Sequence, residues 1–147
     1  MDMMKKLILI GRTQSGKTTL CQRLHDVDIE YKKTQSVEGY KNAIDTPGEY
    51  IENRFYYKAL IVTSADADVI GLVQDATDDR SYFPPGFGAS FSKTIIGILT
   101  KVDLVDNEKV LSEREQYLEI AGAEKIFRVS PKEGIGVEEL QNFLNEI

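Results

Sequence analysis

The sequence contains a single cysteine, Cys21, and a single histidine, His25, among its 147 residues. One cysteine excludes an internal disulfide and a cysteine-based zinc site. Long hydrophobic runs are also missing. The apolar run that follows Met1–Lys6 is too short for a signal peptide or a membrane-spanning helix. Repeats, low-complexity tracts and linkers are absent as well, so we expect one cytoplasmic domain over residues 1–147.

Positive charge is in short supply, with 18 lysines and arginines against 24 aspartates and glutamates, a net charge of −6 and a pI of about 4.9. An acidic surface argues against nucleic acid as a general partner. It does not exclude a nucleotide, because backbone amides meet the few phosphates of a nucleotide locally. We therefore expect no nucleic-acid or membrane partner, and a phosphate-bearing small ligand is the class left open.

The most informative stretch is G-x-x-x-x-G-K-[ST], which spans Gly11 to Thr18. The apolar run Leu7–Ile10 precedes it, and a helical pattern with Leu20 and Leu24 on one face follows it. Glycines in such a loop let the backbone turn tightly and aim its N–H groups at phosphate oxygens, next to the positive end of the helix. The predicted phosphate-binding residues are Gly11, Arg12, Thr13, Gln14, Ser15, Gly16, Lys17, Thr18 and Thr19.

Within this loop Lys17 is expected to reach the β- and γ-phosphates, and the Thr18 hydroxyl to hold Mg²⁺. A second metal-side element follows the short apolar segment Tyr40–Ile44. There Asp45 would hold Mg²⁺ through water, and the Gly48 amide would meet the γ-phosphate. The short sequence separation between Lys17 and Asp45 leaves little room, so we expect a stunted second strand.

Base recognition is predicted at Thr100, Lys101 and Asp103, which follow another buried apolar run. The two carboxylate oxygens of Asp103 can accept from the guanine ring N–H and the exocyclic amine together. Adenine has no amine there, and each charge-assisted bond lost costs on the order of 1.5–3 kcal/mol. The aliphatic stem of Lys101 would lie along the plane of the base.

Strand and helix patterns alternate along the chain, which predicts an α/β fold with a mostly parallel, doubly wound sheet and helices on both faces. Residues 78–92 interrupt this pattern, because two prolines and two glycines forbid most of a helix there. We expect a Pro/Gly/aromatic loop in place of the third helix, and we prefer a packed cover to an exposed docking site. Strands are expected at Lys5–Ile10, Tyr40–Ile44, Asp68–Gln74, Thr94–Leu99 and Lys125–Val129, and helices at Gly16–His25, Glu52–Thr63, Asn107–Ala121 and from Val137 to Ile147, with a polar, non-helical segment at 28–37.

These motifs occur in the order of the small Ras-like GTPases, and the chain resembles the EutP/PduV family more closely. That likeness is carried by Gly11–Thr19, Asp45–Tyr50 and Phe83–Phe87. Members are small P-loop proteins encoded with bacterial microcompartment systems for ethanolamine and propanediol use, and we favour the ethanolamine branch. The resemblance covers nearly the whole chain. It implies a P-loop NTPase domain with GTP or GDP and Mg²⁺ as cofactors, and a protein partner in a microcompartment system.

The resemblance also assigns residues that the local pattern alone does not. Thr34, with Ser36 as the second candidate, would close over the γ-phosphate and Mg²⁺ in the first switch. Ser130, Pro131 and Lys132 would approach the guanine carbonyl. The expected catalytic set is Lys17, Thr34, Gly48 and Glu49.

Three positions depart from the Ras-like pattern. Glu49 replaces the water-orienting glutamine, and its carboxylate repels the γ-phosphate, so we expect slow unassisted hydrolysis. Gln14 stands where potassium-stimulated relatives carry asparagine, which leaves potassium dependence open. Pro131 has no N–H to offer the guanine carbonyl, so discrimination against ATP weakens unless Ser130 or Lys132 supplies that donor.

Three functions stay open at this point. The first is a slowly hydrolysing GTP switch that docks on a microcompartment component. The second is an ATP-dependent acetate kinase, an activity described for members of this family, although Arg12, Arg54 and Arg80 are the only arginines placed to bind a carboxylate. The third is a structural adaptor that keeps its nucleotide without cycling, as Glu49 and the loop at 82–87 suggest.

Overall fold

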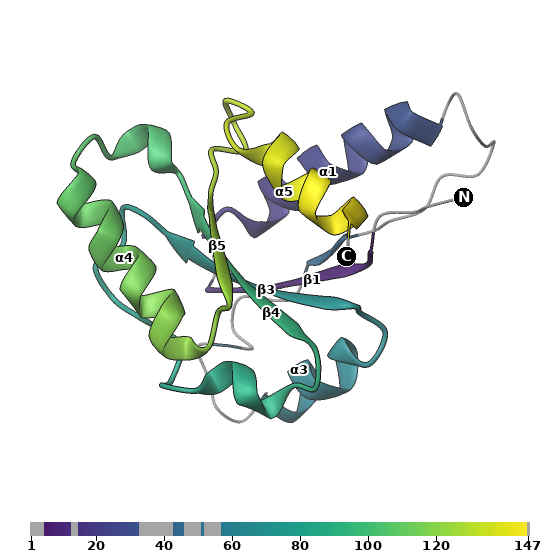
Figure 1. Cartoon of the computed structure of the whole chain (residues 1–147), viewed down its shortest axis with the longest axis horizontal. Coiled ribbons are helices and arrows are strands. Elements are labelled where there is room, and N and C mark those ends of the chain that lie inside the picture. The colour runs from purple at the N-terminus through teal and green to yellow at the C-terminus, as the bar shows by residue number, and fades with distance from the viewer. Residues whose placement is uncertain (1–4, 13–14, 33–42, 46–50, 52–56, 147) are drawn as a thin grey trace.

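A computed structural model describes residues 5–12, 15–32, 43–45, 51 and 57–146, with side chains left out of the description at 25–32 and 43–45. In this part of the chain the core is a five-stranded sheet in the order β2-β1-β3-β4-β5, in which every neighbouring pair is parallel (Figure 1). The strands are β1 (Leu7–Ile10), β2 (Ala43–Asp45), β3 (Val69–Asp75), β4 (Thr94–Thr100) and β5 (Lys125–Arg128). Strand β2 covers the end of the strand expected at Tyr40–Ile44, whose residues 40–42 lie outside the described part of the chain.

Helices cover both faces of the sheet, which confirms the doubly wound architecture. The helices are α1 (Lys17–Lys32), α3 (Tyr57–Ser64), α4 (Glu108–Ala121) and α5 (Val137–Glu146), with 3₁₀ turns η2 (Phe87–Ser90) and η3 (Val102–Leu104). Leu7 and Leu9 of β1 pack with α1 and α5, whereas Ile8 and Ile10 pack with α3, η2 and α4. All four residues are fully buried because each face of the strand has its own helical layer.

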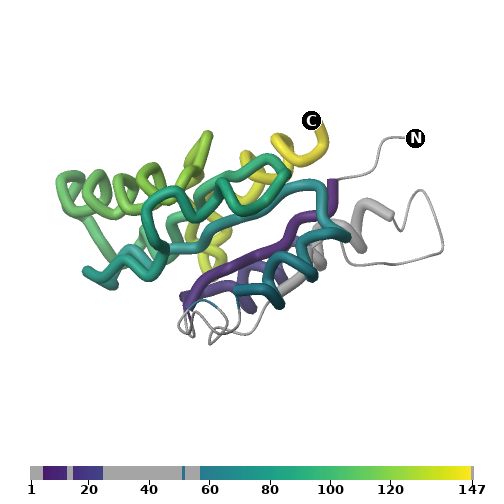
Figure 2. Tube along the Cα trace, turned by 90° about the horizontal axis from the view of Figure 1, so that it is seen from below, coloured from purple at the N-terminus to yellow at the C-terminus, as the bar shows by residue number. Residues whose placement is uncertain are grey.

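Strand β1 lies between β2 and β3 in the sheet. The connection that follows β1 leads to β2 on one side, and the connection that follows β3 leads to β4 on the other side. The two connections therefore diverge at the carboxyl ends of β1 and β3. Figure 2 shows β1 and β3 running side by side through the middle of the trace. In open α/β sheets such a topological switch point is where ligands bind, and here it receives the Gly11–Thr18 loop.

The first helix is longer than the sequence pattern predicts. It runs to Lys32, so the expectation of a non-helical segment beginning at Asp28 is wrong for residues 28–32. No glycine or proline lies between Lys17 and Lys32 to end the helix.

The aromatic loop after β3 is a packed cover, as expected. Phe83, Phe87 and Phe91 are all buried, and the Phe87 ring centroid lies 5.7 Å from that of Phe83 and 5.3 Å from that of Phe91. The loop docks on the end of α4 through a hydrogen bond of 2.8 Å from the Gly86 N–H to the Ile120 carbonyl. Burying these rings replaces the missing helical layer over β3 and β4.

The ends of α4 follow the capping signals in the sequence. Asn107 accepts hydrogen bonds from the N–H groups of Lys109 and Val110, and Gly122 ends the helix in the left-handed region at φ 113°. Across the residues that the structure describes, none of the helices has the length and apolar character to pass through a membrane.

Candidate functional site

The glycines of the loop between β1 and α1 are required by its close contact with β3 and β4. A Cβ at Gly11 would lie 2.7 Å from the Val73 carbonyl oxygen, and a Cβ at Gly16 would lie 3.3 Å from Thr100. Gly16 also has φ 101°, in the left-handed region that glycine adopts without strain. The backbone therefore curls tightly over the carboxyl ends of β1, β3 and β4.

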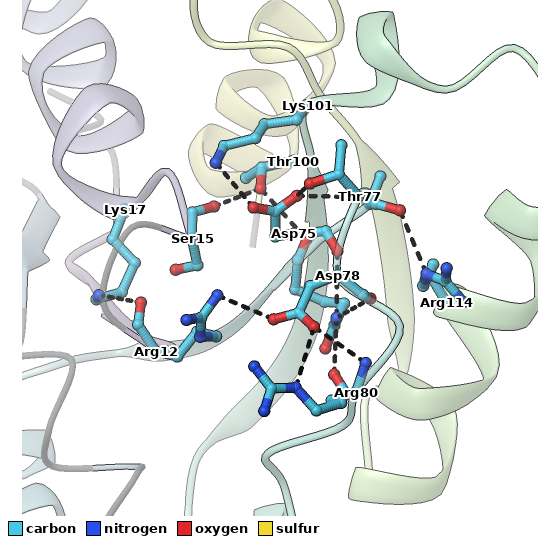
Figure 3. Close-up of polar contacts among 12 residues, drawn as sticks. Arg12, Ser15, Lys17, Asp75, Thr77, Asp78, Arg80, Thr100, Lys101 and Arg114 are labelled. Carbon is cyan, nitrogen blue, oxygen red and sulfur yellow. Dashed lines mark hydrogen bonds and ion pairs between the residues drawn. The ribbon is translucent and has the colours of Figure 1, made fainter.

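Several polar groups of this loop are placed to meet an anion. Ser15 Oγ is buried and has no hydrogen-bond partner among the described residues. The Lys17 side chain is only 5% exposed, and its Nζ donates to the Arg12 carbonyl at 3.1 Å, so the ammonium lies along the loop (Figure 3). Thr18 and Thr19 are exposed in the first turn of α1. The described loop residues thus fit a phosphate group at the positive end of a helix.

Thr100 joins the loop to the predicted base-recognition motif. Its Oγ1 donates to the Ser15 carbonyl, so the end of β4 is fixed to the phosphate-binding loop (Figure 3). The next residue, Lys101, has φ 60°, which costs a side-chain-bearing residue about 1 kcal/mol or more. Asp103 follows in η3 and is exposed. The motif therefore stands next to the loop with its carboxylate accessible to a ligand.

Asp75, at the end of β3, holds Lys101 in this conformation. Its Oδ2 lies 2.8 Å from Lys101 Nζ, and its Oδ1 accepts from the N–H and hydroxyl of Thr77 at 2.8 and 2.6 Å. Sequence reasoning missed Asp75 as a site residue. The signal was a carboxylate directly after a buried strand, at the same sheet edge as the loop.

A second group missed from the sequence surrounds Arg12. Its Nη1 lies 3.0 Å from Asp78 Oδ2, and its guanidinium carbon lies 5.1 Å from the centre of the Tyr82 ring. Arg80 lies 5.4 Å from the same ring centre and 3.7 Å from Asp78 Oδ1 (Figure 3). Both arginines are therefore engaged by Asp78 and Tyr82 and do not form a free pair for a carboxylate ligand.

The third predicted element, Ser130-Pro131-Lys132, follows β5. The Val102 N–H donates to the Val129 carbonyl at 3.3 Å, which places this segment beside the motif at 100–103. Ser130 and Pro131 are buried, and Lys132 is exposed. The three predicted elements that the structure describes thus meet at one edge of the sheet.

The metal-side residues are placed only in part. The Asp45 backbone pairs with Leu9 in parallel register, so the carboxyl end of β2 lies beside the end of β1, from which the phosphate-binding loop begins. A hydroxyl and a carboxylate are the oxygen donors that Mg²⁺ prefers, so this donor set fits the ion. Within the described ranges no group of three or more His, Cys, Asp or Glu could hold a metal. The remaining predicted residues, Thr13, Gln14, Thr34, Gly48 and Glu49, lie outside the described part of the chain.

An ion-pair group next to the site fixes β5 to α4. Arg128 donates to Glu108 at 2.8 Å and to Glu115 at 2.7 Å, and these bonds raise the pKa of Arg128. The hydrogen bond from Arg128 lowers the pKa of the Glu108 carboxyl. Because that pKa is depressed in the folded state, the link stabilises the fold above the ordinary carboxyl pKa and is lost as the pH falls.

A glycine loop between the first parallel strand and its helix, with a second motif at the end of β4, defines a P-loop domain of the GTPase fold. The elongation factor SelB from Methanococcus maripaludis, solved with the GTP analogue GppNHp, shares this fold with a TM-score of 0.63 and 22% identity. The alignment covers 97% of this chain and 33% of SelB, so the chain spans about a third of that protein's length.

The chain belongs to the PduV-EutP family, described as ethanolamine utilisation - propanediol utilisation, whose model matches residues 4–146. Propanediol utilization protein PduV from Citrobacter freundii is 43% identical, over 97% of this chain and 94% of its own length. The protein named "Probable acetate kinase EutP" from Escherichia coli (strain K12) is 35% identical, over 96% of this chain and 89% of its own length. The family expected from the sequence is confirmed, but these identities do not support our preference for the ethanolamine branch.

Proposed function

We propose that this chain is a Mg²⁺-dependent guanine-nucleotide-binding protein that hydrolyses GTP slowly. It acts as a cytoplasmic switch in ethanolamine or propanediol utilisation, and it docks on a protein component of a microcompartment. The observation that carries the proposal is the hydrogen bond from Thr100 to the Ser15 carbonyl. It links the phosphate-binding loop to the strand end that carries the Asp103 motif. This supports a single domain over residues 1–147 that binds one ligand with phosphates at one end and a base at the other.

Each part of the nucleotide has its own protein groups in this proposal. The backbone of residues 11–19 surrounds the phosphates, with Lys17 beside the β- and γ-phosphates, and Asp103 pairs with the base. Thr18 and Asp45, with Thr34 from outside the described residues, would hold Mg²⁺. The ion, when bound, neutralises the phosphate charge. The same phosphate geometry serves GDP, GTP and ATP, and therefore the base selectivity rests on Asp103.

The slow rate and the switching follow from sequence positions beyond the described residues. Glu49 places a carboxylate where a water-orienting amide is expected, and like charges repel in the presence of a triphosphate. Gly48 would bind the γ-phosphate and release the segment after hydrolysis. A partner that supplies the missing water-orienting group would therefore accelerate the reaction.

Acetate kinase activity is the second candidate, because it is the activity in the printed name of the EutP relative. Pro131 also removes one expected guanine-selecting N–H, which favours ATP. Against it, Asp78 and Tyr82 already engage Arg12 and Arg80. The third candidate, an adaptor that keeps its nucleotide without cycling, is supported only by Glu49. The aromatic loop no longer supports it, because Phe83 and Phe87 are buried and not free for docking.

Binding of four nucleotides to the purified, nucleotide-stripped chain tests the proposal. In Mg²⁺ we expect GDP and GTP to bind at least 100-fold more tightly than ADP and ATP, because two charge-assisted bonds at Asp103 amount to about 3 kcal/mol. GTP turnover should be slow, and acetate with ATP should give no acetyl phosphate. Equal affinity for GTP and ATP, together with acetyl phosphate formation, would instead establish the kinase. A bound diphosphate that never exchanges would establish the adaptor.

A further inference from the structure

Hydrogen bonds within the loop after β5 determine which of its N–H groups are available to a ligand. Ser130 and Ile135 form an isolated antiparallel bridge, in which the Ser130 N–H donates to the Ile135 carbonyl at 2.9 Å. The Glu133 N–H donates to Ser130 Oγ at 3.3 Å. The Ser130 N–H is therefore already used within the loop, and Pro131 has no N–H.

Lys132 carries the remaining candidate donor of the Ser130-Pro131-Lys132 segment. Its N–H pairs with no acceptor in the portion of the chain that the structure describes. The sequence leaves Ser130 and Lys132 as the residues that could replace the N–H donor missing at Pro131. Because the Ser130 N–H is already bonded within the loop, Lys132 is the one that remains.

Arg23 of α1 fixes the direction of that donor. Its Nε donates to the Pro131 carbonyl at 2.9 Å, and its Nη2 donates to the Lys132 carbonyl at 3.0 Å. The Pro131 carbonyl and the Lys132 N–H belong to the same planar, trans peptide group, so they point in opposite directions. A guanidinium that holds the carbonyl on one side therefore aims the N–H to the other side, away from α1.

The loop also lies on the base side of the site. The Val102 N–H donates to the Val129 carbonyl at 3.3 Å, so the segment begins next to the motif that ends in Asp103. Asp103 is an acceptor for the ring N–H and the exocyclic amine of guanine, and the third polar group on that edge is the carbonyl at purine position 6. An unpaired backbone N–H in the segment that begins next to the Asp103 motif is the complementary group.

From these contacts we propose that Arg23 is a specificity-determining positioning residue, which aims the Lys132 N–H at the 6-carbonyl of a purine nucleotide. This inference rests on the proposed guanine-nucleotide function and names the groups that replace the donor lost with Pro131. Arg23 does not contact the nucleotide. It acts through the Pro131–Lys132 peptide, and it couples the phosphate-binding helix to base selection.

The test compares GDP with the diphosphate of 2,6-diaminopurine riboside, which keeps the 2-amine and the phosphates but carries an amine in place of the 6-carbonyl and no proton on ring N1. Each variant is therefore compared with the wild type for the same nucleotide. For Arg23→Met, which keeps most of the apolar stem, we expect GDP affinity to fall about tenfold and affinity for the diaminopurine nucleotide to stay within about twofold. Arg23→Lys keeps a donor and should fall between wild type and Arg23→Met. Lys109→Met, which removes an exposed cationic side chain of α4 away from the site, should leave both affinities unchanged.

Equal losses for both nucleotides, or unchanged GDP affinity, would overturn the role of Arg23. Equal losses would mean that Arg23 only supports the fold, and a melting curve without nucleotide checks this independently. If the wild-type chain itself binds GDP and ADP equally, the proposed guanine function fails. If the wild type prefers GDP and Arg23→Met keeps the full preference, only the inference about Arg23 fails.

Discussion

Replacing Lys17 with methionine is expected to lower the affinity for GDP, GTP and ATP alike by about 100-fold. Lys17 is buried along the phosphate-binding loop with its Nζ on the Arg12 carbonyl, so its charge is positioned before a ligand arrives. Charge-assisted hydrogen bonds to phosphates contribute about 1.5–3 kcal/mol each, and the loss of about 3 kcal/mol is two orders of magnitude in affinity. Equilibrium titration with each nucleotide in Mg²⁺ measures the effect.

Methionine keeps the apolar stem of Lys17, which limits the loss of packing in this variant. Lys109→Met, at an exposed position on α4, is the matched control and should bind every nucleotide as the wild type does. A melting temperature close to that of the wild type, measured without nucleotide, shows that the fold is retained. Affinity within threefold of wild type in a folded Lys17→Met protein would contradict the assignment of this loop to phosphate binding.

Gly136→Ala is expected to lower the free energy of unfolding by about 3 kcal/mol. Gly136 has φ 74°, a region that costs a residue with a Cβ about 1–2 kcal/mol. The added Cβ would also overlap the Arg128 carbonyl oxygen, so the backbone must move, at a further cost of about 1–3 kcal/mol. Because the displaced loop carries Lys132, we expect GDP affinity to fall as well. Urea unfolding curves measure the change in stability.

Gly86→Ala is the control that separates the two costs. Gly86 has φ 72°, but an added Cβ there would meet no atom within 4 Å. This variant should therefore lose only about 1–2 kcal/mol and keep its affinity for GDP. If Gly136→Ala is no less stable than Gly86→Ala, the close packing of the loop against β5 is not the cause.

The sequence predicts those features that depend on residues close together in the chain. Buried runs such as Leu7–Ile10 predict their strands, and the glycines at 11 and 16 predict the loop, because both are set by local periodicity and backbone freedom. The aromatic cover also follows, since prolines and glycines forbid a helix and phenylalanines seek burial.

What the sequence does not predict are pairings between distant segments. Asp75 with Lys101, Arg12 with Asp78 and Arg23 with Pro131 join residues that lie on different elements of the fold. Each is decided by which strands lie next to one another, and no local pattern carries that information. The length of α1 is not predicted for another reason. The largely polar segment 28–32 gives only a weak helical pattern, but extending an existing helix is easier than starting one, so α1 continues through it.

Nucleotide preference of Asp103→Asn is the measurement that tests the central claim most directly. A carboxylate accepts from both guanine donors, whereas an amide accepts from one and donates through the other, which suits the 2-carbonyl of xanthine. We expect the wild type to bind GDP more tightly than xanthosine diphosphate, and Asp103→Asn to reverse this order, with GDP affinity falling about 100-fold. An unchanged preference in Asp103→Asn would contradict guanine recognition at this site.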